Sequence, residues 1–503
     1  EMKNRLIRSI LVMACLLGLA AAAQAQSDAR WQALDSYIQT AMHDGRVPGL
    51  AVGIVQNGQA VYVKGFGVRD ITTGQPVTPD TLFDIGSCTK AFTAAAVGIL
   101  VDEGKMHWDD RVDEYIPFFH LYDPLADENV TMRDLLTHRT GMGGTDLLWY
   151  GGSFSAEEII RRVRYIPPEF GFRARFEYQN VMYATAGYAV GQASGGTWQD
   201  FVRAHIWAPL GMTGADFSAT DAQNAADHAT PHDLKDGKVV TIPWRNIDNV
   251  APAGSINAGV KDMTKWIAMQ LNDGMANGQQ IVSAKSLRET HTPQIVVPQG
   301  GEFDLFFPKS LQMSYGMGWF IQDYDGHQIW LHPGDIDGFA SLVVLIPEVK
   351  TGFVILTNLD HTALRAGLGW HLVDEFLNLP QQDWVAHFQK VADQFSAMEK
   401  RAEAGEANPK HPDTHPSREL AAYAGTYRSK AYGDVVVTLE GDQLQVKFNS
   451  FNGTLKHFQY DTFVGDLGGF GRAPVMFSLD EGGDVSKVTM DGIEFDRVNG
   501  AGQ

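Results

Sequence analysis

The chain has 503 residues, of which 44% are hydrophobic and 20% are charged, and its formal net charge is −20. This composition excludes a disordered chain, and the length predicts two or three domains because a single core rarely grows this large. The negative charge argues against a nucleic-acid partner or an anionic lipid surface, since both require clustered Lys and Arg.

Residues 1–25 predict a secretory signal peptide. Basic residues precede an apolar run over 10–23, and Ala23-Gln24-Ala25 forms a small-x-small cleavage motif. We therefore expect an exported protein, periplasmic or secreted, whose mature chain begins at Gln26. No later segment is apolar enough to predict a membrane span. Removal of the signal leaves Cys88 as the single cysteine, so we expect no intrachain disulfide.

The pattern over residues 26–380 predicts one α/β domain. Strand runs and helical stretches alternate along it in this order: a helix over 29–43, a hairpin over 49–70 that turns at Asn57-Gly58, an apolar helix after Lys90, a mostly helical middle over about 107–250, a helix over 260–274, and strands over 315–324, 326–334 and 340–358. Because the strands lie at both ends of the domain, we expect an antiparallel sheet flanked by helices, with a mostly helical region beside it.

The remaining residues change character twice. A helix followed by a polar, Pro-rich segment predicts a linker over residues 381–417. Residues 418–503 contain short alternating strands joined by Gly, Asp and Asn turns. This pattern predicts a small all-β barrel or sandwich domain at the C-terminus.

The stretch GSCTKAFT, residues 86–93, raises the first chemical possibility. It precedes an apolar helical run, so Ser87 is expected at the helix start with Lys90 one turn on, on the same face. A lysine with a lowered pKa can take the proton of a serine hydroxyl and make it a nucleophile. Alone, so short a motif favours the plain alternative, in which Ser87 caps the helix and Lys90 is solvated.

Two further motifs accompany this one. Tyr178-x-Asn180 lies where a loop enters a predicted helix, and by itself it fits a packed aromatic residue and a helix cap. His332-Pro333-Gly334 lies on or beside a strand near the end of the α/β domain, and alone it is the weaker signal.

In this order and at these spacings, the three motifs resemble the active-site set of the serine β-lactamase and penicillin-binding-protein superfamily. The resemblance is to its class C-like branch (peptidase S12 type), which includes D-amino-acid peptidases, carboxylesterases and class C β-lactamases. It covers about residues 30–380 and extends to the segments VPGLAVGIVQNGQAVYVKGFG, TPDTLFDIGSCTKAFTAAAVGILVDEGK, VTMRDLLTHRTGM and YGMGWF. Residues 418–498 resemble the lipocalin-like C-terminal domain that some members carry.

The resemblance implies acyl transfer through a covalent acyl-enzyme. By position, Ser87 is the expected nucleophile, Lys90 its proton acceptor, and Tyr178 the partner base or proton shuttle. Asn180 is expected to hydrogen-bond the substrate or Lys90. The backbone N–H groups of Ser87 and Asp335 are the expected oxyanion hole, where fixed dipoles stabilise developing negative charge.

The third motif departs from the form most common in the family. Lactamases and transpeptidases usually carry Lys-Thr/Ser-Gly there, whereas this chain has His332 and Pro333, and proline supplies neither a hydroxyl nor an N–H. Strong recognition of a penicillin-type carboxylate is therefore not expected. His332 and Gly334 are retained as candidate substrate-binding residues.

These observations favour a serine hydrolase acting on small peptides or amides, with carboxylesterase activity an equal alternative and class C-type β-lactamase activity a lesser one. The rival class is a non-catalytic sensor or binding protein of the same fold, which should have lost Ser87, Lys90 or Tyr178.

The sequence shows no metal-binding, P-loop or dinucleotide motif, so no metal site or cofactor is expected. The expected partners are a small-molecule substrate and, as one possibility, further copies of the chain. Cys88 and His138 are interpreted as structural.

Overall fold

The computed structural model describes residues 28–300, 307–360, 362–403, 411, 413–468 and 471–498. The predicted signal peptide, residues 1–25, lies outside the described residues. Over the described ranges, no helix is both long and apolar enough to cross a membrane.

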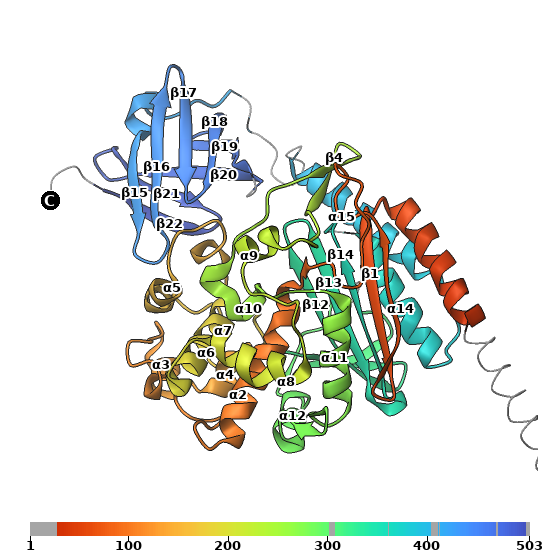
Figure 1. Ribbon diagram of the computed structural model, residues 1–503. Helices are drawn as coiled ribbons and strands as arrows, with labels where there is room; N and C mark the ends of the chain where they lie inside the picture. The colour runs from red at the N-terminus through yellow and green to blue at the C-terminus, as the bar shows by residue number, and fades with distance from the viewer. Residues whose placement is uncertain are drawn as a thin grey trace, which may run out of the picture.

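The centre of the α/β domain is an eight-stranded antiparallel sheet (Figure 1). The strands stand in the order β2-β1-β14-β13-β12-β11-β10-β9, so the N-terminal hairpin pairs with the last strand of the domain, as the sequence predicts. Asn57 and Gly58 have φ values of 51° and 76° in the turn of that hairpin, the geometry that selects this residue pair. The strands are β1 (Gly49–Gln56), β2 (Gln59–Gly67), β9 (Ile295–Val296), β10 (Ser310–Tyr315), β11 (Phe320–Tyr324), β12 (His327–Ile336), β13 (Phe339–Ile346) and β14 (Thr351–Thr357).

Helices cover both faces of this sheet. The helix over residues 28–45 and α14 (Ala363–Phe376) lie on one face, and α2 (Thr89–Asp102) and α11 (Val260–Leu271) lie on the other (Figure 1). Because side chains alternate along a strand, Phe353 and Ile355 of β14 pack toward the first layer and Val354 and Leu356 toward the second. The result is a three-layer domain with α2 in the interior.

The helical region inserted between β2 and β9 lies beside the α2 face. It is built of short helices: α3 (Pro124–Asn129), α4 (Met132–Leu136), α5 (Ala156–Arg162), α6 (Asn180–Ser194), α7 (Trp198–Val202), α8 (Ala208–Leu210), α9 (Ala219–Asn224), α10 (Ala251–Gly254) and α12 (Ala284–Thr290). Two-stranded pairs join some of them: β3 (Phe83–Asp84) with β6 (Asn257–Ala258), β4 (His232–Lys235) with β5 (Lys238–Thr241), and β7 (Met275–Ala276) with β8 (Gln279–Gln280).

The C-terminal domain is a closed barrel of eight consecutive antiparallel strands, which settles the choice between barrel and sandwich. It closes where Tyr427 and Arg428 pair with Arg497 and Asp496, and alternate side chains are buried inside it. Its strands are β15 (Gly425–Ser429), β16 (Gly433–Glu440), β17 (Gln443–Phe448), β18 (Phe451–Gln459), β19 (Thr462–Asp466), β20 (Arg472–Leu479), β21 (Val485–Met490) and β22 (Ile493–Arg497).

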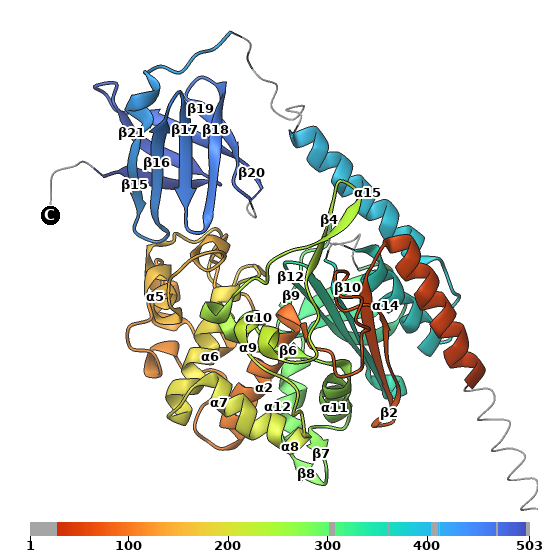
Figure 2. The same ribbon diagram turned by 45° about the horizontal axis from the view of Figure 1, so that its top comes forward.

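The barrel sits on the helical region, not on the sheet. Helix α15 (Trp384–Glu403) follows α14 and leads toward the barrel, which lies over the α5 end of the helical region in both ribbon views (Figures 1 and 2). Arg162 at the end of α5 donates to the backbone carbonyls of Lys430 and Ala431, between β15 and β16, at 3.0 and 3.2 Å.

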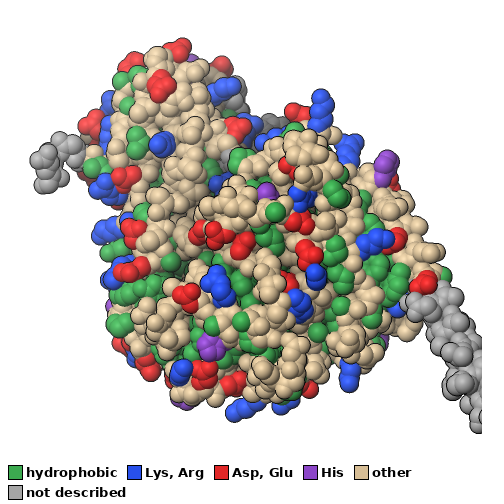
Figure 3. All heavy atoms as spheres, in the orientation of Figure 1, with side chains coloured by type: hydrophobic (Ala, Val, Ile, Leu, Met, Phe, Trp, Pro, Cys, Tyr) green, Lys and Arg blue, Asp and Glu red, His purple; other side chains and the backbone are tan. Residues whose placement is uncertain are grey.

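Acidic and basic side chains are interspersed over the face shown in Figure 3.

The packing of α2 on α11 gives a stability prediction. Phe92 is fully buried, and its ring stacks on that of Trp266 with a centroid separation of 3.8 Å. Phe92→Ala should lower the free energy of unfolding by about 3–5 kcal/mol, because it leaves a cavity in a close-packed interior. Ten of the 11 tryptophans lie in the α/β domain and the other, Trp384, lies on α15, so tryptophan fluorescence in a urea titration reports mainly on the α/β domain. Tyr122→Ala, at a side chain 58% exposed, is the control, and an equal effect of the two variants would contradict the prediction.

Candidate active site

Ser87 is presented at the start of α2. A short 3₁₀ turn, Gly86–Cys88, runs directly into that helix, and Ser87 is the one residue over positions 81–100 that is not buried. Gly86 has a φ of +48°, and a Cβ on it would lie 2.7 Å from the amide nitrogen of Asp335. Glycine therefore permits both the backbone conformation and the close approach of this turn to β12.

Lys90 makes three hydrogen bonds in the interior. Its Nζ lies 2.9 Å from Ser87 Oγ, 2.7 Å from Asn180 Oδ1 and 2.8 Å from the carbonyl oxygen of Ala253. The side chain is fully buried. The serine and lysine that the sequence places one helical turn apart are thus in direct contact.

The surroundings of Lys90 favour the neutral amine. Burial lowers the pKa of Lys90 from its ordinary value of 10.5 to about 7, and the negative charge of Asp146 opposes part of this shift. The amide oxygen of Asn180 and the carbonyl oxygen of Ala253 can only accept hydrogen bonds. A neutral Lys90 amine therefore directs its two N–H groups at these oxygens and leaves its lone pair for the hydroxyl of Ser87.

Tyr178 completes the group around Ser87. The Lys90 Nζ atom lies 4.7 Å from the centroid of the Tyr178 ring, and the Ser87 hydroxyl is near enough to the phenol to influence its pKa. Burial raises the pKa of Tyr178 well above its ordinary value, although the neighbouring Ser87 hydroxyl acts in the opposite direction. Tyr178 is therefore a neutral phenol at physiological pH, able to donate a proton or relay one.

His138 holds the backbone on both sides of Tyr178. The N–H of Glu177 donates to the His138 carbonyl at 2.8 Å, and the N–H of Gln179 donates to His138 Nδ1 at 2.9 Å. The His138 and Tyr178 rings lie 4.4 Å apart, and His138 is fully buried. His138 therefore has a structural role, as interpreted from the sequence, and that role is to hold Tyr178 in position.

Asn180 is the first residue of α6 and links Lys90 to a residue that the sequence did not single out. Its Nδ2 donates to Asp146 Oδ1 at 3.2 Å, while its Oδ1 accepts from Lys90. Asp146 also accepts from Trp149 Nε1 at 2.8 Å. Asp146 lies in the loop stretch GGTDLLW, which has no recognisable motif, so only the fold reveals its place beside the site.

The proposed oxyanion donors lie on adjoining segments of backbone. A Cβ on Gly334 would fall 2.9 Å from the amide nitrogen of Ser87, so this end of β12 and the Ser87 turn touch. Arg365 donates to the Gly334 carbonyl at 3.0 Å and to Asp335 Oδ1 at 2.6 Å, which fixes the strand end. The amides of Ser87 and Asp335 thus flank one edge of the site.

His332 is buried, with both ring nitrogens occupied. Its Nδ1 lies 2.6 Å from the Pro333 carbonyl oxygen, an acceptor, and its Nε2 lies 3.1 Å from the hydroxyl of Tyr315. Burial, together with the charge of Lys90, lowers the pKa of His332 to about 3, so the ring is neutral. Direct substrate binding by His332 stays a prediction, and this geometry favours a role in packing.

Cys88, the residue after Ser87, is buried between the Ser87 turn and strands β12 and β13. Its Sγ lies 3.1 Å from the His332 carbonyl oxygen and 3.2 Å from Ser341 Oγ, and burial raises the pKa of its thiol to about 12. A thiol in this state is neither ionised nor exposed, which agrees with the structural interpretation of Cys88.

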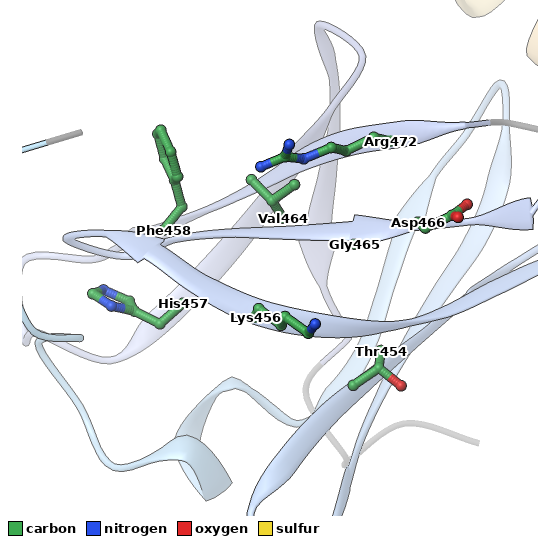
Figure 4. A pocket seen from close by; sticks show the side chains of 8 residues that line it. All are labelled: Thr454, Lys456, His457, Phe458, Val464, Gly465, Asp466 and Arg472. Carbon is green, nitrogen blue, oxygen red and sulfur yellow. The ribbon is translucent and has the colours of Figure 1, made fainter. Parts of the chain in front are cut away.

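A separate hollow of about 600 Å³ lies on the barrel (Figure 4). Its lining residues come from β18, β19 and β20, and Ser87, Lys90 and Tyr178 are not among them. This hollow is therefore separate from the site formed by Ser87, Lys90 and Tyr178.

Known proteins resemble both domains of the chain. The family model described as Beta-lactamase matches residues 34–378, and one described as a domain of unknown function (DUF3471) matches residues 409–501. The Unguisins hydrolase ungD of Aspergillus violaceofuscus is 29% identical over 432 residues, which cover 78% of this chain and 74% of the relative. Protein flp of Staphylococcus aureus is 27% identical over 374 residues, or 73% of this chain and 71% of that protein.

Solved structures share the fold over most of the chain. The octameric penicillin-binding protein homologue from Pyrococcus abyssi superposes with a TM-score of 0.61 at 24% identity, over 92% of this chain and 98% of that one. SurE superposes with a TM-score of 0.56 at 20% identity, over 93% and 98% of the two chains. The family match spans most of the chain and includes every residue of the candidate site. The chain therefore belongs to the β-lactamase family, within the superfamily of serine hydrolases related to penicillin-binding proteins.

Proposed function

We propose that this chain is an exported serine hydrolase that cleaves small peptides, amides or esters through an acyl-enzyme on Ser87. The observation that carries the proposal is the buried Lys90 amine 2.9 Å from Ser87 Oγ, because Ser87 is the one residue over positions 81–100 that is not buried. A binding protein has no need of a lysine with a lowered pKa beside a hydroxyl, whereas a nucleophile does.

The geometry supports a two-step reaction. Ser87 Oγ attacks the substrate carbonyl carbon, its proton passes to Lys90 Nζ, and the amides of Ser87 and Asp335 stabilise the oxyanion. Collapse breaks the bond to the leaving group, which receives a proton through Tyr178, and the acyl group remains on Ser87. Water then loses a proton to the same bases, attacks the ester, and releases the acid and free Ser87.

The substrate class follows from what the site lacks. His332 is neutral and Pro333 has no hydroxyl, so this position offers no charge to pair with the carboxylate of a penicillin. We therefore place peptides, amides and esters before β-lactams. The relative named Unguisins hydrolase supports hydrolytic function in this branch of the family. A non-catalytic sensor is the second candidate, and the intact contacts among Ser87, Lys90 and Asn180 count against it.

Export and assembly belong to the same proposal. The signal-like residues 1–25 support removal before Gln26 and a periplasmic or secreted destination. A homo-oligomer is also proposed, on the ground that the Pyrococcus abyssi homologue is described as octameric.

Turnover by the mature protein tests the function directly. Wild type should release product from a p-nitrophenyl ester series or from D- or L-aminoacyl p-nitroanilides faster than from nitrocefin. Ser87→Ala should lose this activity by about 10³-fold or more, because the variant lacks the hydroxyl on which the proposed acyl-enzyme forms. Wild type and Ser87→Ala that were equally inert on every panel would instead favour the sensor.

The pH profile tests the role of Lys90. A base must be unprotonated to act, so kcat/KM should rise with pH to a plateau above the Lys90 pKa of about 7. Asp146 holds that pKa up, so Asp146→Asn should move the acid limb to lower pH. Asp221→Asn, at an exposed position on α9, should leave it in place. A wild-type profile with no inflection near pH 7, or no movement in Asp146→Asn, would exclude this role for Lys90.

His138 provides a test of how Tyr178 is positioned. His138→Ala removes the acceptor of the Gln179 N–H, and displacement of Tyr178 should lower kcat by about ten- to a hundredfold. His138→Asn keeps a side-chain acceptor and tolerates the φ of +56° at this position, so it should recover most of the activity. Equal loss of kcat in both variants, with equal loss of stability, would assign His138 to the core alone.

A further inference from the structure

We propose that the C-terminal barrel is a working part of the active site. Its turns between β15 and β16 and between β17 and β18 fix the loop over residues 143–154, and that loop in turn fixes Asn180 against Lys90. The inference rests on the proposed function and assigns a role to the domain of unknown function. We call residues 143–154 the docking loop.

Donors on the barrel satisfy backbone carbonyls along the docking loop. The hydroxyl of Tyr432 donates to the Gly144 carbonyl at 3.0 Å, and Asn449 Nδ2 donates to the Leu147 carbonyl at 3.3 Å. The N–H of Ser450 donates to the Gly151 carbonyl at 3.0 Å. Three bonds spread over eight residues hold the path of the backbone, which a single tether between domains would not do.

Close packing accompanies these hydrogen bonds. A Cβ on Gly151 would lie 2.5 Å from Phe451 Cζ and 2.6 Å from Ser450 Oγ, so the loop backbone rests against the barrel. Phe451 is 4% exposed, and its ring stacks on that of Tyr150 with centroids 5.7 Å apart. Close packing of this kind transmits the position of the barrel to the docking loop.

Asp146, which contacts Asn180, lies between two residues of the docking loop whose carbonyls accept hydrogen bonds from the barrel. Asp146 stands between Gly144 and Leu147 and accepts from Asn180 Nδ2 at 3.2 Å. Asn180 accepts from Lys90 through the other end of the same amide, at 2.7 Å. Asp146 therefore decides which way the amide of Asn180 faces, since a flipped amide would point its NH₂ at the Lys90 amine.

A second connection reaches the oxyanion side. The hydroxyl of Tyr150 donates to Asp337 Oδ1 at 2.7 Å, and Arg245 Nε donates to Asp337 Oδ2 at 2.9 Å. Asp337 lies two residues beyond Asp335, in the turn between β12 and β13. Through Tyr150, Phe451 of the barrel thus also supports the strand end that carries an oxyanion donor.

The matched test places a methyl group at this contact. Gly151 and Gly74 have φ values of +64° and +66°, so alanine is equally strained at both, but no heavy atom lies within 4 Å of a Cβ at Gly74. In the full mature chain, Gly151→Ala should reduce the rate of Ser87 acylation by a fluorophosphonate and kcat by about tenfold, with little change in KM. Gly74→Ala should retain wild-type rates, with a melting temperature similar to that of Gly151→Ala.

A second pair of variants, with smaller changes, keeps the proposal testable if Gly151→Ala does not fold. Tyr432→Phe removes one donor to the docking loop, and Tyr460→Phe removes a hydroxyl from a tyrosine 55% exposed elsewhere on the barrel. Amide hydrogen exchange gives a readout independent of activity. Tyr432→Phe should speed exchange in residues 143–154 and in the first turn of α6, and Tyr460→Phe should not.

The outcomes separate the two proposals. Wild-type rates and unchanged exchange in both Gly151→Ala and Tyr432→Phe, with wild type itself acylated, would overturn the role of the barrel and leave the hydrolase intact. A wild-type protein that is not acylated while Tyr432→Phe still loosens α6 would overturn the hydrolase and retain the coupling between the barrel and Asn180.

Discussion

The burial of the Lys90 amine is the constraint on which this structure depends. A charged ammonium in the interior is costly, so the site must either neutralise it or surround it with acceptors. Here the acceptors are two oxygens that cannot donate, on Asn180 and Ala253, and the third neighbour is the hydroxyl of Ser87. The arrangement that makes Lys90 tolerable as a buried residue also leaves its lone pair directed at one hydroxyl, as the proposed role of a base requires.

Each partner in this arrangement is held by a different part of the chain. Ser87 lies on a turn that contacts β12 through Gly86, Tyr178 is held between two bonds to His138, and Asn180 is turned by Asp146. The sheet, the helical region and, as we propose, the barrel therefore meet at one lysine. Precision in such a site comes from the supporting residues as much as from the reacting ones.

Local patterns in the sequence were enough to predict the local geometry. The i, i+3 spacing of Ser87 and Lys90 and the Asn57-Gly58 hairpin turn depend on a few neighbouring residues, and both appear as expected. Contacts between distant segments left no such pattern. Asp146, the two-sided bond to His138 and the burial of His332 all arise where loops meet. The strand expected over residues 315–324 is also broken at 316–319, where Gly318 packs on Ala91 of α2.

The most direct test is a titration of Lys90 itself. The ¹³Cε signal of labelled lysine, assigned by its disappearance in Lys90→Arg, reports the protonation of that amine by NMR. The account predicts a midpoint near pH 7, well separated from the signals of the solvent-exposed lysines. A midpoint near the ordinary value of 10.5 would mean that Lys90 stays charged beside Ser87, and it would contradict the assignment of Lys90 as the base.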